Sequence, residues 1–379
     1  MKKIYLAEPF FGIEEFFMGC SMLKTLKQHR YGIWTKKVEE MISQLMSVKY
    51  SFLTTSCTSA LELSLWIYEF PPGFEAIIPS FTFVSTANAV IRQKGKPVFV
   101  DIERKTLNIN PDLIEDKVNE KTKVIIPVHY AGVGCNMEKI INIAKKHNLV
   151  IIEDAAHAFG AKFNNKYLGT FGDIGCFSFH ITKNFTCGEG GAIVTDNELL
   201  ARKIEIFRDK GTNRAQFIRK EINKYDWISE GSSYVISDFL SMLLYHQLKK
   251  FKKNNYLRKK KAEYLYYQLG KSNLKEYITF PNKEILENSN YHICYILVKD
   301  ERDRNPLIEY LNQKGIESAF HYQPLHLSPY IKNKYIINES LPVTEEVASK
   351  IVRLPIYPQI KKSQIRYIVR TIKNFFKGI

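Results

Sequence analysis

The sequence contains no long run of apolar residues. None of its apolar stretches approaches the roughly 20 residues that a helix needs to cross a bilayer. The apolar run that follows the two lysines at the start is also too short for a signal peptide. We therefore expect a cytoplasmic protein that has no membrane partner.

Closely spaced cysteine pairs are absent as well. The six cysteines, none of them in a C-x-x-C pair, are Cys20, Cys57, Cys135, Cys176, Cys187 and Cys294. Without that spacing the sequence indicates neither a zinc site nor a redox dithiol, and we expect no bound metal. Several of these cysteines lie in apolar or glycine-rich runs, where a reduced thiol acts as a small hydrophobic group.

Acidic residues are too few to balance the basic ones. The chain has 39 acidic and 55 basic residues, which gives a formal net charge of +16, and much of the excess lies within 249–261. A solvated helix face explains such a run, although the charge could also attract acidic substrates such as nucleotide diphosphates. No nucleic-acid recognition motif accompanies the charge, so we expect no nucleic-acid partner.

A regular alternation of strands and helices occupies the region from about 48 to 210. The expected strands are 50–54, 76–79, 97–100, 124–128, 150–153, 176–179 and 192–194, and the expected helices are 59–68, 82–92, 112–118 and 137–147. Several of these strands are continuous β-branched runs, which are typical of strands buried on both faces of a mainly parallel sheet. The pattern predicts a doubly wound α/β fold.

The pattern changes after this region. We expect a helix over 198–209, a polar and aromatic loop over 211–233, a long basic helix over 237–269, a strand over 292–298 and helices over 307–314 and 362–376. The 379 residues suffice for one large and one smaller unit. We expect a large α/β domain over 1–240 and a smaller α+β domain over 241–379.

Candidate ligand-binding groups follow three of the expected strands. The segment S-C-T-S-A at 56–60 opens a helix, where free backbone N–H groups and nearby hydroxyls suit a phosphate; an ordinary helix N-cap is the alternative. Ser178, on a later strand, would point back toward that phosphate. Phe83 follows the strand at 76–79, on the edge where α/β proteins bind ligands, and could stack on a planar ring or belong to the core.

A carboxylate and a lysine also follow strands. Asp154 ends a buried run, where a carboxylate needs a partner such as a protonated pyridine nitrogen, unless it caps a helix. His157 could contact the phenolic oxygen of the same ring or be an ordinary buried histidine. Lys183 would attack an aldehyde if a dry pocket lowered its pKa, but would be solvated in an open loop. His180 beside it could move protons. The order of these groups predicts a pyridine cofactor that the lysine binds covalently.

Seven segments of the chain match one family. They read T-S-C-T-S-A-L at 55–61, P-S-F-T-F-V-S-T-A-N at 79–88, P-V-H-Y-A-G at 127–132, E-D-A-A-H at 153–157, G-D-I-G-C-F-S-F-H at 172–180, T-K-N-F-T-C-G-E-G-G-A at 182–192 and H-Y-Q-P-L-H at 321–326. On these segments, the chain resembles the DegT/DnrJ/EryC1/StrS nucleotide-sugar aminotransferases, a family within fold type I of the pyridoxal-phosphate enzymes. The resemblance covers the chain from about 6 to 375.

The resemblance implies a role for each candidate residue. Lys183 would bind pyridoxal 5′-phosphate and then act as acid and base in the proton transfer, with His180 nearby and Asp154 at the ring nitrogen. The implied phosphate contacts are Thr58, Ser59 and Ser178, and the implied ring contacts are Phe83 and His157. The implied contacts to the sugar nucleotide are Thr212, Asn213, Arg214, His321, Tyr322 and His326.

The resemblance also implies a reaction, the transamination of a nucleotide-linked keto sugar with L-glutamate in a homodimer that shares its active sites. Four segments, at 128–133, 179–186, 209–219 and 231–238, resemble members that convert dTDP-4-keto-6-deoxyglucose into dTDP-4-amino-4,6-dideoxygalactose for surface polysaccharides such as the O-antigen of lipopolysaccharide. The gluco epimer, a 3-amino sugar and sugar dehydration are the alternatives. Dehydrating relatives carry a histidine in place of the lysine, so Lys183 disfavours dehydration.

One segment departs from the family pattern. Many relatives read Asn-Tyr-Arg where this chain has Ser233, Tyr234 and Val235. A polar side chain in that segment of the relatives reaches the cofactor phosphate of the neighbouring subunit. The resemblance therefore does not carry that hydrogen bond over to this chain.

Overall fold

The computed structural model describes residues 3–15, 17–18, 32–335 and 340–378. Cys20 lies outside these residues, and the five other cysteines are buried and carry free thiols. Within the described ranges, no helix is both long and apolar enough to cross a membrane.

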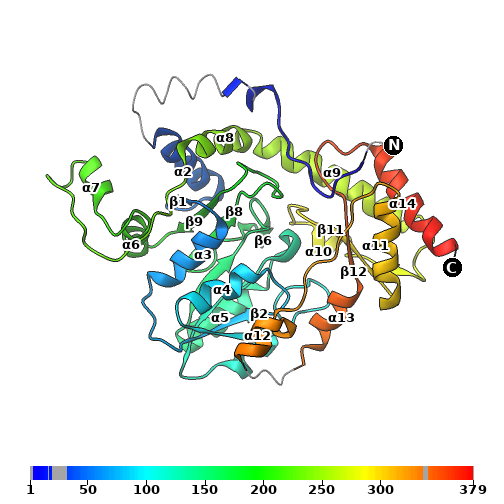
Figure 1. The fold of residues 1–379 in the computed structure, drawn as a ribbon, viewed down its shortest axis with the longest axis horizontal. Coiled ribbons are helices and arrows are strands. Elements are labelled where there is room, and N and C mark those ends of the chain that lie inside the picture. Colours follow the sequence, from blue (N-terminus) through cyan, green and yellow to red (C-terminus); the bar gives the residue numbers. More distant parts are fainter. Residues whose placement is uncertain (1–2, 16, 19–31, 336–339, 379) are drawn as a thin grey trace.

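A mainly parallel sheet forms the centre of the fold (Figure 1). In the described part of the chain it has seven strands, in the order β1-β9-β8-β5-β4-β2-β3. Their bounds are β1 Tyr50–Thr54, β2 Glu75–Pro79, β3 Lys96–Val100, β4 Thr122–Ile125, β5 Val150–Asp154, β8 Ile174–Ser178 and β9 Gly191–Thr195. Strand β9 is antiparallel to β1 and β8, while β8, β5, β4, β2 and β3 pair in parallel. The predicted α/β fold is confirmed.

Helices cover both faces of this sheet. They are α2 (Ile33–Met46), α3 (Cys57–Trp66), α4 (Val84–Arg92), α5 (Met137–His147), α6 (Glu198–Arg208) and α8 (Asp238–Lys249). Successive strand residues point to opposite faces, so Ile77 and Ile151 join the apolar cluster that includes α5. Their neighbours Ile78 and Ile152 join the cluster that includes α3 and α4. Burial on both faces explains why these strands read as continuous apolar runs.

A second, antiparallel sheet lies in the C-terminal part, where β10 (Ile278–Thr279) and β12 (Ile351–Leu354) flank β11 (Cys294–Val298). The helices α9 (Phe251–Gly270), α11 (Arg304–Gln313) and α14 (Lys362–Lys377) share a core with this sheet. Ile4 bridges to Ile316 and belongs to the same core, so the N-terminal segment is bound to the C-terminal part. Domains over 1–240 and 241–379 stay a proposal.

The described chain also contains shorter elements. They are β6 (Lys162–Phe163), β7 (Lys166–Tyr167), α7 (Arg214–Ile218), α10 (Lys283–Leu286), α12 (Pro329–Lys334), α13 (Pro342–Lys350) and the 3-10 turns Pro111–Leu113, Glu115–Lys117, Tyr130–Gly132, Glu301–Asp303 and Leu325–Leu327. Two of these turns replace the helix expected over 112–118, because so short a segment gains too few hydrogen bonds to offset the cost of nucleating an α-helix. The loop expected over 211–233 contains α7.

The prediction of one long basic helix over 237–269 is also wrong. The helix is interrupted at Lys250, which separates α8 from α9. The ammonium group of Lys250 donates to both carboxylate oxygens of Glu15, at 2.6 and 2.7 Å, and lies 3.0 Å from Glu14. Buried residues continue at intervals of three or four through the break, from Leu244 and Leu248 of α8 to Phe251 and Asn254 of α9, so the spacing itself does not mark the break. The break coincides with a contact to a distant segment, which periodicity does not reveal.

Gly191 is the residue at which β9 comes close to the start of α3. A Cβ placed on it would lie 2.4 Å from the Ser56 carbonyl carbon and 2.5 Å from the Cys57 backbone nitrogen. Because backbone atoms cannot move aside as a flexible side chain can, we expect Gly191→Ala to lower the free energy of unfolding by about 1–3 kcal/mol. Urea denaturation measures this change.

Gly270, at the end of α9, provides the matched control for that substitution. A Cβ there would meet only the Phe280 ring, at 3.9 Å. Gly270→Ala should leave the stability unchanged or raise it by up to about 1 kcal/mol, because alanine favours the helix. Equal effects of the two substitutions would contradict the close approach of β9 to α3.

Candidate active site

The candidate residues gather at the carboxyl edge of the central sheet. Strand β5 ends with Asp154, and its parallel neighbour β8 ends with Ser178. Ser178 is opposite Gly191 in the ladder, and Gly191 touches the start of α3. The expected phosphate and ring-nitrogen groups thus lie along one edge, where open α/β sheets bind ligands.

Asp154 is a buried carboxylate whose partners are neutral. Thr86 donates its Oγ1 hydroxyl to Oδ2 at 2.7 Å, and the Ala156 backbone N–H donates to Oδ1 at 3.2 Å. Burial raises the pKa of Asp154 despite these two donors. No lysine, arginine or histidine in the described ranges forms an ion pair with it. A protonated ring nitrogen would supply the missing positive charge.

Lys183 lies in a loop that is closed at its base, where the Phe179 N–H donates to the Gly190 carbonyl at 2.8 Å. The lysine is half-buried. Burial is the main cause that lowers its pKa to about 8, the positive charge of Arg353 lowers it further, and Asp154 opposes the change. A substantial neutral fraction near neutral pH makes the Nζ a nucleophile.

The segment at the start of α3, which the sequence predicts to bind a phosphate, provides both a helix N-cap and a cluster of hydroxyl groups. The Ser59 N–H donates to Ser56 Oγ at 3.0 Å, which confirms the N-cap interpretation. The Ser59 hydroxyl lies 2.8 Å from Thr55 Oγ1, and Thr58 Oγ1 lies 2.7 Å from Ser85 Oγ. These hydroxyls bond to one another next to the helix N-terminus, an arrangement that also suits a phosphate.

Aromatic rings gather beside Asp154. The His157 Nδ1 accepts a long hydrogen bond of 3.4 Å from the Ala131 N–H, and its Nε2 lies 3.2 Å from the Tyr322 hydroxyl. Burial, together with the charge of Lys183, holds the pKa of His157 well below its usual value, so the ring is neutral. Phe83 is 55% exposed, and its ring centroid lies 6.3 Å from that of Tyr322. An exposed ring in this position is free to stack on a ligand.

The three residues expected at the sugar from segment 321–326 have different surroundings. Tyr322 reaches His157, and the His321 Nε2 accepts from Arg353 Nη1 at 3.0 Å. His326 instead contacts Ser80 Oγ through Nδ1 at 2.7 Å and a Glu345 oxygen through Nε2 at 3.2 Å. Both ring nitrogens of His326 are therefore engaged in bracing the sheet edge against α13.

The loop at 211–214 and His180 do not join this cluster. The Thr212 hydroxyl donates to the Asp209 carbonyl at 2.9 Å, Asn213 Oδ1 accepts from the Asp226 N–H at 2.7 Å, and Arg214 lies 4.0 Å from Asp209. Helix α7, which begins in this loop, projects from the rest of the described chain (Figure 1). The roles expected for Thr212, Asn213 and Arg214 stay a prediction.

His180 lies at the surface beside the lysine loop. Its Nδ1 is 2.9 Å from Thr182 Oγ1, and its Nε2 is 3.4 Å from Glu189 Oε1. The ring is thus directed toward an exposed carboxylate. A catalytic role for His180 stays a prediction.

Sequence reasoning missed three groups at the site: Thr86, Asn184 and Arg353. Thr86 lies one helical turn after Phe83, a spacing that could have placed both at one edge. Asn184 donates to the Asn290 carbonyl at 3.1 Å, and its Oδ1 lies 2.9 Å from His292 Nδ1. The residue next to Lys183 is therefore held by the C-terminal part of the chain.

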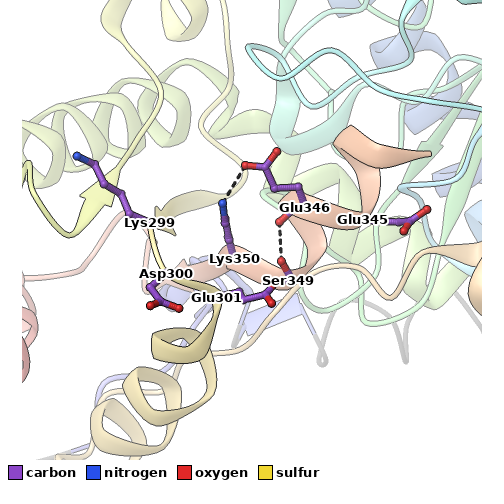
Figure 2. A pocket seen from close by; sticks show the side chains of 7 residues that line it. All are labelled: Lys299, Asp300, Glu301, Glu345, Glu346, Ser349 and Lys350. Atoms are coloured by element: carbon purple, nitrogen blue, oxygen red, sulfur yellow. Dashed lines mark hydrogen bonds and ion pairs between the residues drawn. The ribbon is translucent and has the colours of Figure 1, made fainter. Parts of the chain in front are cut away.

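A surface hollow between the turn at Glu301–Asp303 and α13 holds none of the predicted site residues. It is lined by Lys299, Asp300, Glu301, Glu345, Glu346, Ser349 and Lys350 (Figure 2). Lys350 donates to Glu346 at 2.9 Å, so part of its charge is paired within the wall. The hollow is an open surface feature, and we assign it no ligand.

The fold, with Asp154 at the end of β5 and Lys183 in the loop after β8, suits a pyridoxal-phosphate-dependent enzyme. The comparisons agree with this class: a profile of the DegT/DnrJ/EryC1/StrS aminotransferase family matches residues 17–373. The spore coat polysaccharide biosynthesis protein SpsC of Bacillus subtilis is 32% identical over 353 residues, 90% of this chain and 90% of that protein. The chain therefore belongs to the DegT/DnrJ/EryC1/StrS aminotransferase family.

Two solved structures share the fold over nearly the whole chain. PseC of Helicobacter pylori, an aminotransferase involved in the biosynthesis of pseudoaminic acid, has a TM-score of 0.89 and 27% identity, with 100% of both chains covered. NtdA of Bacillus subtilis, solved with bound cofactor PMP, has a TM-score of 0.85 and 29% identity, with 98% of this chain and 86% of that chain covered. The expected fold and cofactor, pyridoxal phosphate, are confirmed.

The lowered pKa of Lys183 is open to a direct test. Because only the neutral amine reacts with acetic anhydride, its acetylation in cofactor-free protein should reach half its maximal rate near pH 8, as the proton leaves a group that burial has made more acidic. Mass spectrometry of competitively labelled protein gives the rate at each lysine. Lys139, whose pKa the neighbouring Asp112 raises, is the internal control. A midpoint for Lys183 above about pH 10 would show that burial does not lower its pKa.

Proposed function

We propose that the protein transfers the amino group of L-glutamate to a nucleotide-linked keto sugar, dTDP-4-keto-6-deoxyglucose, and releases dTDP-4-amino-4,6-dideoxygalactose. The observation that carries the proposal is that the carboxyl edge of the sheet brings together two groups. Asp154 is a buried carboxylate that forms no ion pair among the described residues, and Lys183 is a lysine whose pKa burial lowers to about 8. The first group suits a protonated pyridine, and the second suits an aldehyde.

Each residue of the site has its own role in the proposed reaction. When bound, pyridoxal phosphate supplies an electron sink for negative charge that develops on carbon. Asp154, held by Thr86, keeps the ring nitrogen protonated, and the hydroxyls at the start of α3 hold the phosphate. Lys183 binds the cofactor, then removes the proton from the α-carbon of glutamate and later delivers one to the sugar carbon. Its pKa near the working pH suits both directions of proton transfer.

His157, which is neutral, and its hydrogen-bond partner Tyr322 orient the edge of the cofactor ring. Because the His157 Nδ1 accepts from the Ala131 N–H, the proton of the neutral ring is on Nε2. Nε2 then donates to the Tyr322 oxygen, which leaves the Tyr322 hydroxyl proton for a ligand. We assign the contact with the sugar to Tyr322 and His321, and a bracing role to His326.

The choice of substrate is supported by relatives and by charge. SpsC is named for spore coat polysaccharide biosynthesis, and PseC is an aminotransferase involved in the biosynthesis of pseudoaminic acid. A product destined for a surface polysaccharide agrees with the name of SpsC. A net charge of +16 attracts a doubly charged nucleotide diphosphate to the protein.

A homodimer with shared active sites is part of the proposal. The segment that carries α7 exposes apolar side chains, with Trp227 80% and Ile218 65% exposed. Large exposed apolar groups on a projecting segment favour a protein interface. In a dimer, this segment would bring Thr212, Asn213 and Arg214 to the sugar nucleotide of the neighbouring subunit.

The identity of the product tests the proposed reaction. Purified protein with pyridoxal phosphate, L-glutamate and dTDP-4-keto-6-deoxyglucose should yield 2-oxoglutarate and one amino sugar in equal amounts. Proton NMR of that sugar should show a small H3–H4 coupling, because the amine is axial in the galacto product. A large coupling would instead identify the gluco epimer. No amino sugar, or a 3-amino sugar, would contradict the proposal.

Removing the lysine should abolish turnover while leaving the fold intact. Lys183→Ala should reduce the rate by at least the ~10²–10⁴-fold that a positioned proton-transfer group contributes, yet retain bound cofactor through the phosphate contacts. Coupled detection of 2-oxoglutarate measures the rate. Lys36→Ala, at a side chain that is 79% exposed, is the control and should behave as wild type. Turnover of Lys183→Ala near the wild-type rate would refute the assignment.

A further inference from the structure

His292 is a buried histidine to which the proposed reaction gives no role. It lies two residues before β11 and is 6% exposed. Its backbone N–H donates to Asn290 Oδ1 at 3.0 Å, and its carbonyl accepts from Arg258 Nη2 at 2.9 Å. Arg258 belongs to α9 and is itself buried. The backbone of His292 is therefore fixed from two sides, and a side chain on such a backbone can hold its neighbours precisely.

The ring of His292 holds the residue next to Lys183. The Asn184 side chain donates through Nδ2 to the Asn290 carbonyl at 3.1 Å, so its Oδ1 is the acceptor in the 2.9 Å contact with His292 Nδ1. The Nδ1 of His292 therefore carries a proton and is the donor. The Asn184 carbonyl accepts from Asn254 Nδ2 at 2.7 Å. Asn184 is thus held at its backbone and at its side chain, by residues of α9 and of the segment before β11.

The same ring packs against His157, the expected contact of the cofactor ring. The two ring centroids lie 4.5 Å apart, with an angle of 42° between the ring planes. Asn290 supports this arrangement, because its Nδ2 donates to the carbonyls of His157 and Phe159, at 2.8 and 3.1 Å. His157 follows β5 and Lys183 follows β8, so the two residues belong to different loops. The His292 side chain contacts both loops.

The surroundings of His292 favour a neutral hydrogen-bond donor. Burial, together with neighbouring positive charges such as that of Lys183, holds the pKa of His292 well below its usual value, so the ring is neutral. A charged side chain here would add to the positive charge of Lys183, Arg258 and Arg353. An apolar side chain of similar size would leave the buried Asn184 Oδ1 without this donor. Histidine meets both requirements, since it donates a hydrogen bond while uncharged.

We infer that His292 is a positioning residue that keeps Lys183 and His157 in the arrangement needed for proton transfer at the cofactor. It acts on the lysine loop through its hydrogen bond to Asn184, and on His157 through ring packing. An error of about 1 Å in the position of a reacting group can slow a reaction about 100-fold. The inference rests on the proposed function, because it names the residue that holds the lysine proposed to move the proton.

Loss of the His292 ring should affect the rate of the reaction more than substrate binding. The maximal rate of the donor half-reaction, in which Lys183 moves the proton, should fall, while the half-saturating glutamate concentration changes little. A loosened loop should also expose Lys183 to water and raise its pKa toward the ordinary value. A purely structural histidine would lower the thermal stability and leave the pKa of the lysine unchanged.

Four variants and one control test this inference. His292→Leu removes the donor at similar volume, and His292→Asn restores a donor near the position of Nδ1. Asn184→Ala removes the acceptor, and the double variant with His292→Leu and Asn184→Ala shows whether the two side chains act together. His147→Leu is the control, at a histidine of α5 whose Nε2 lies 2.7 Å from Glu115 Oε1.

Three measurements apply to every variant. Competitive acetylation of cofactor-free protein gives the pKa of Lys183 without any substrate. Stopped-flow absorbance of protein loaded with pyridoxal phosphate gives the maximal rate and the half-saturating concentration for glutamate. Thermal unfolding checks the fold.

We expect His292→Leu to lower the maximal rate roughly 10-fold or more, to leave the half-saturating glutamate concentration within about 3-fold of wild type, and to raise the acetylation midpoint of Lys183 by about half a pH unit or more. His292→Asn should recover part of each loss. The double variant should lose no more than the worse single variant, and His147→Leu should match wild type.

In folded His292→Leu, an unchanged midpoint or a maximal rate within about 3-fold of wild type would overturn the inference, as would losses that multiply in the double variant. If His292→Leu does not fold, Asn184→Ala is judged by the same criteria. If wild-type protein fails to react with glutamate, the proposed function fails instead, and the acetylation midpoints still decide whether His292 holds the lysine.

Discussion

Burial of ionisable groups at the carboxyl edge of the central sheet is the constraint on which the site depends. Asp154 is buried and Lys183 is half-buried, and burial shifts their pKa values toward each other: that of Asp154 rises and that of Lys183 falls. A parallel sheet makes this possible because both faces are covered and only the strand ends remain open. The site is therefore prepared for a ligand that brings its own charge.

Both parts of the chain build this environment. The sheet supplies Asp154 and the loop of Lys183, and the C-terminal part supplies Arg353, His321 and Tyr322. Asn184 joins the two, since its side chain contacts Asn290 and His292 while Asn254 donates to its carbonyl at 2.7 Å. Movement between the two parts would therefore displace the residue next to the lysine.

The sequence was a good guide where local signals decide the structure. The strand that ends at Asp154 follows from an apolar run that stops at acidic residues, and Ser56 has the chemistry of an N-cap. The strand expected over 176–179 instead ends at Ser178. Tertiary contacts decided the rest. The break at Lys250 lies at a contact with Glu15, and His326 braces Ser80, so neither feature has a local signature. Arg353 reads as one more basic residue in an apolar strand until the fold places it beside His321.

The absorption spectrum of the purified protein with pyridoxal phosphate, before and after L-glutamate is added, tests the central claim most directly. The account predicts a visible band from cofactor bound covalently to Lys183, and glutamate should remove that band as the amino group moves to the cofactor. A band that persists in glutamate would contradict the assigned donor. The absence of any band, even with excess pyridoxal phosphate, would contradict the claim that Lys183 and Asp154 together form a cofactor site.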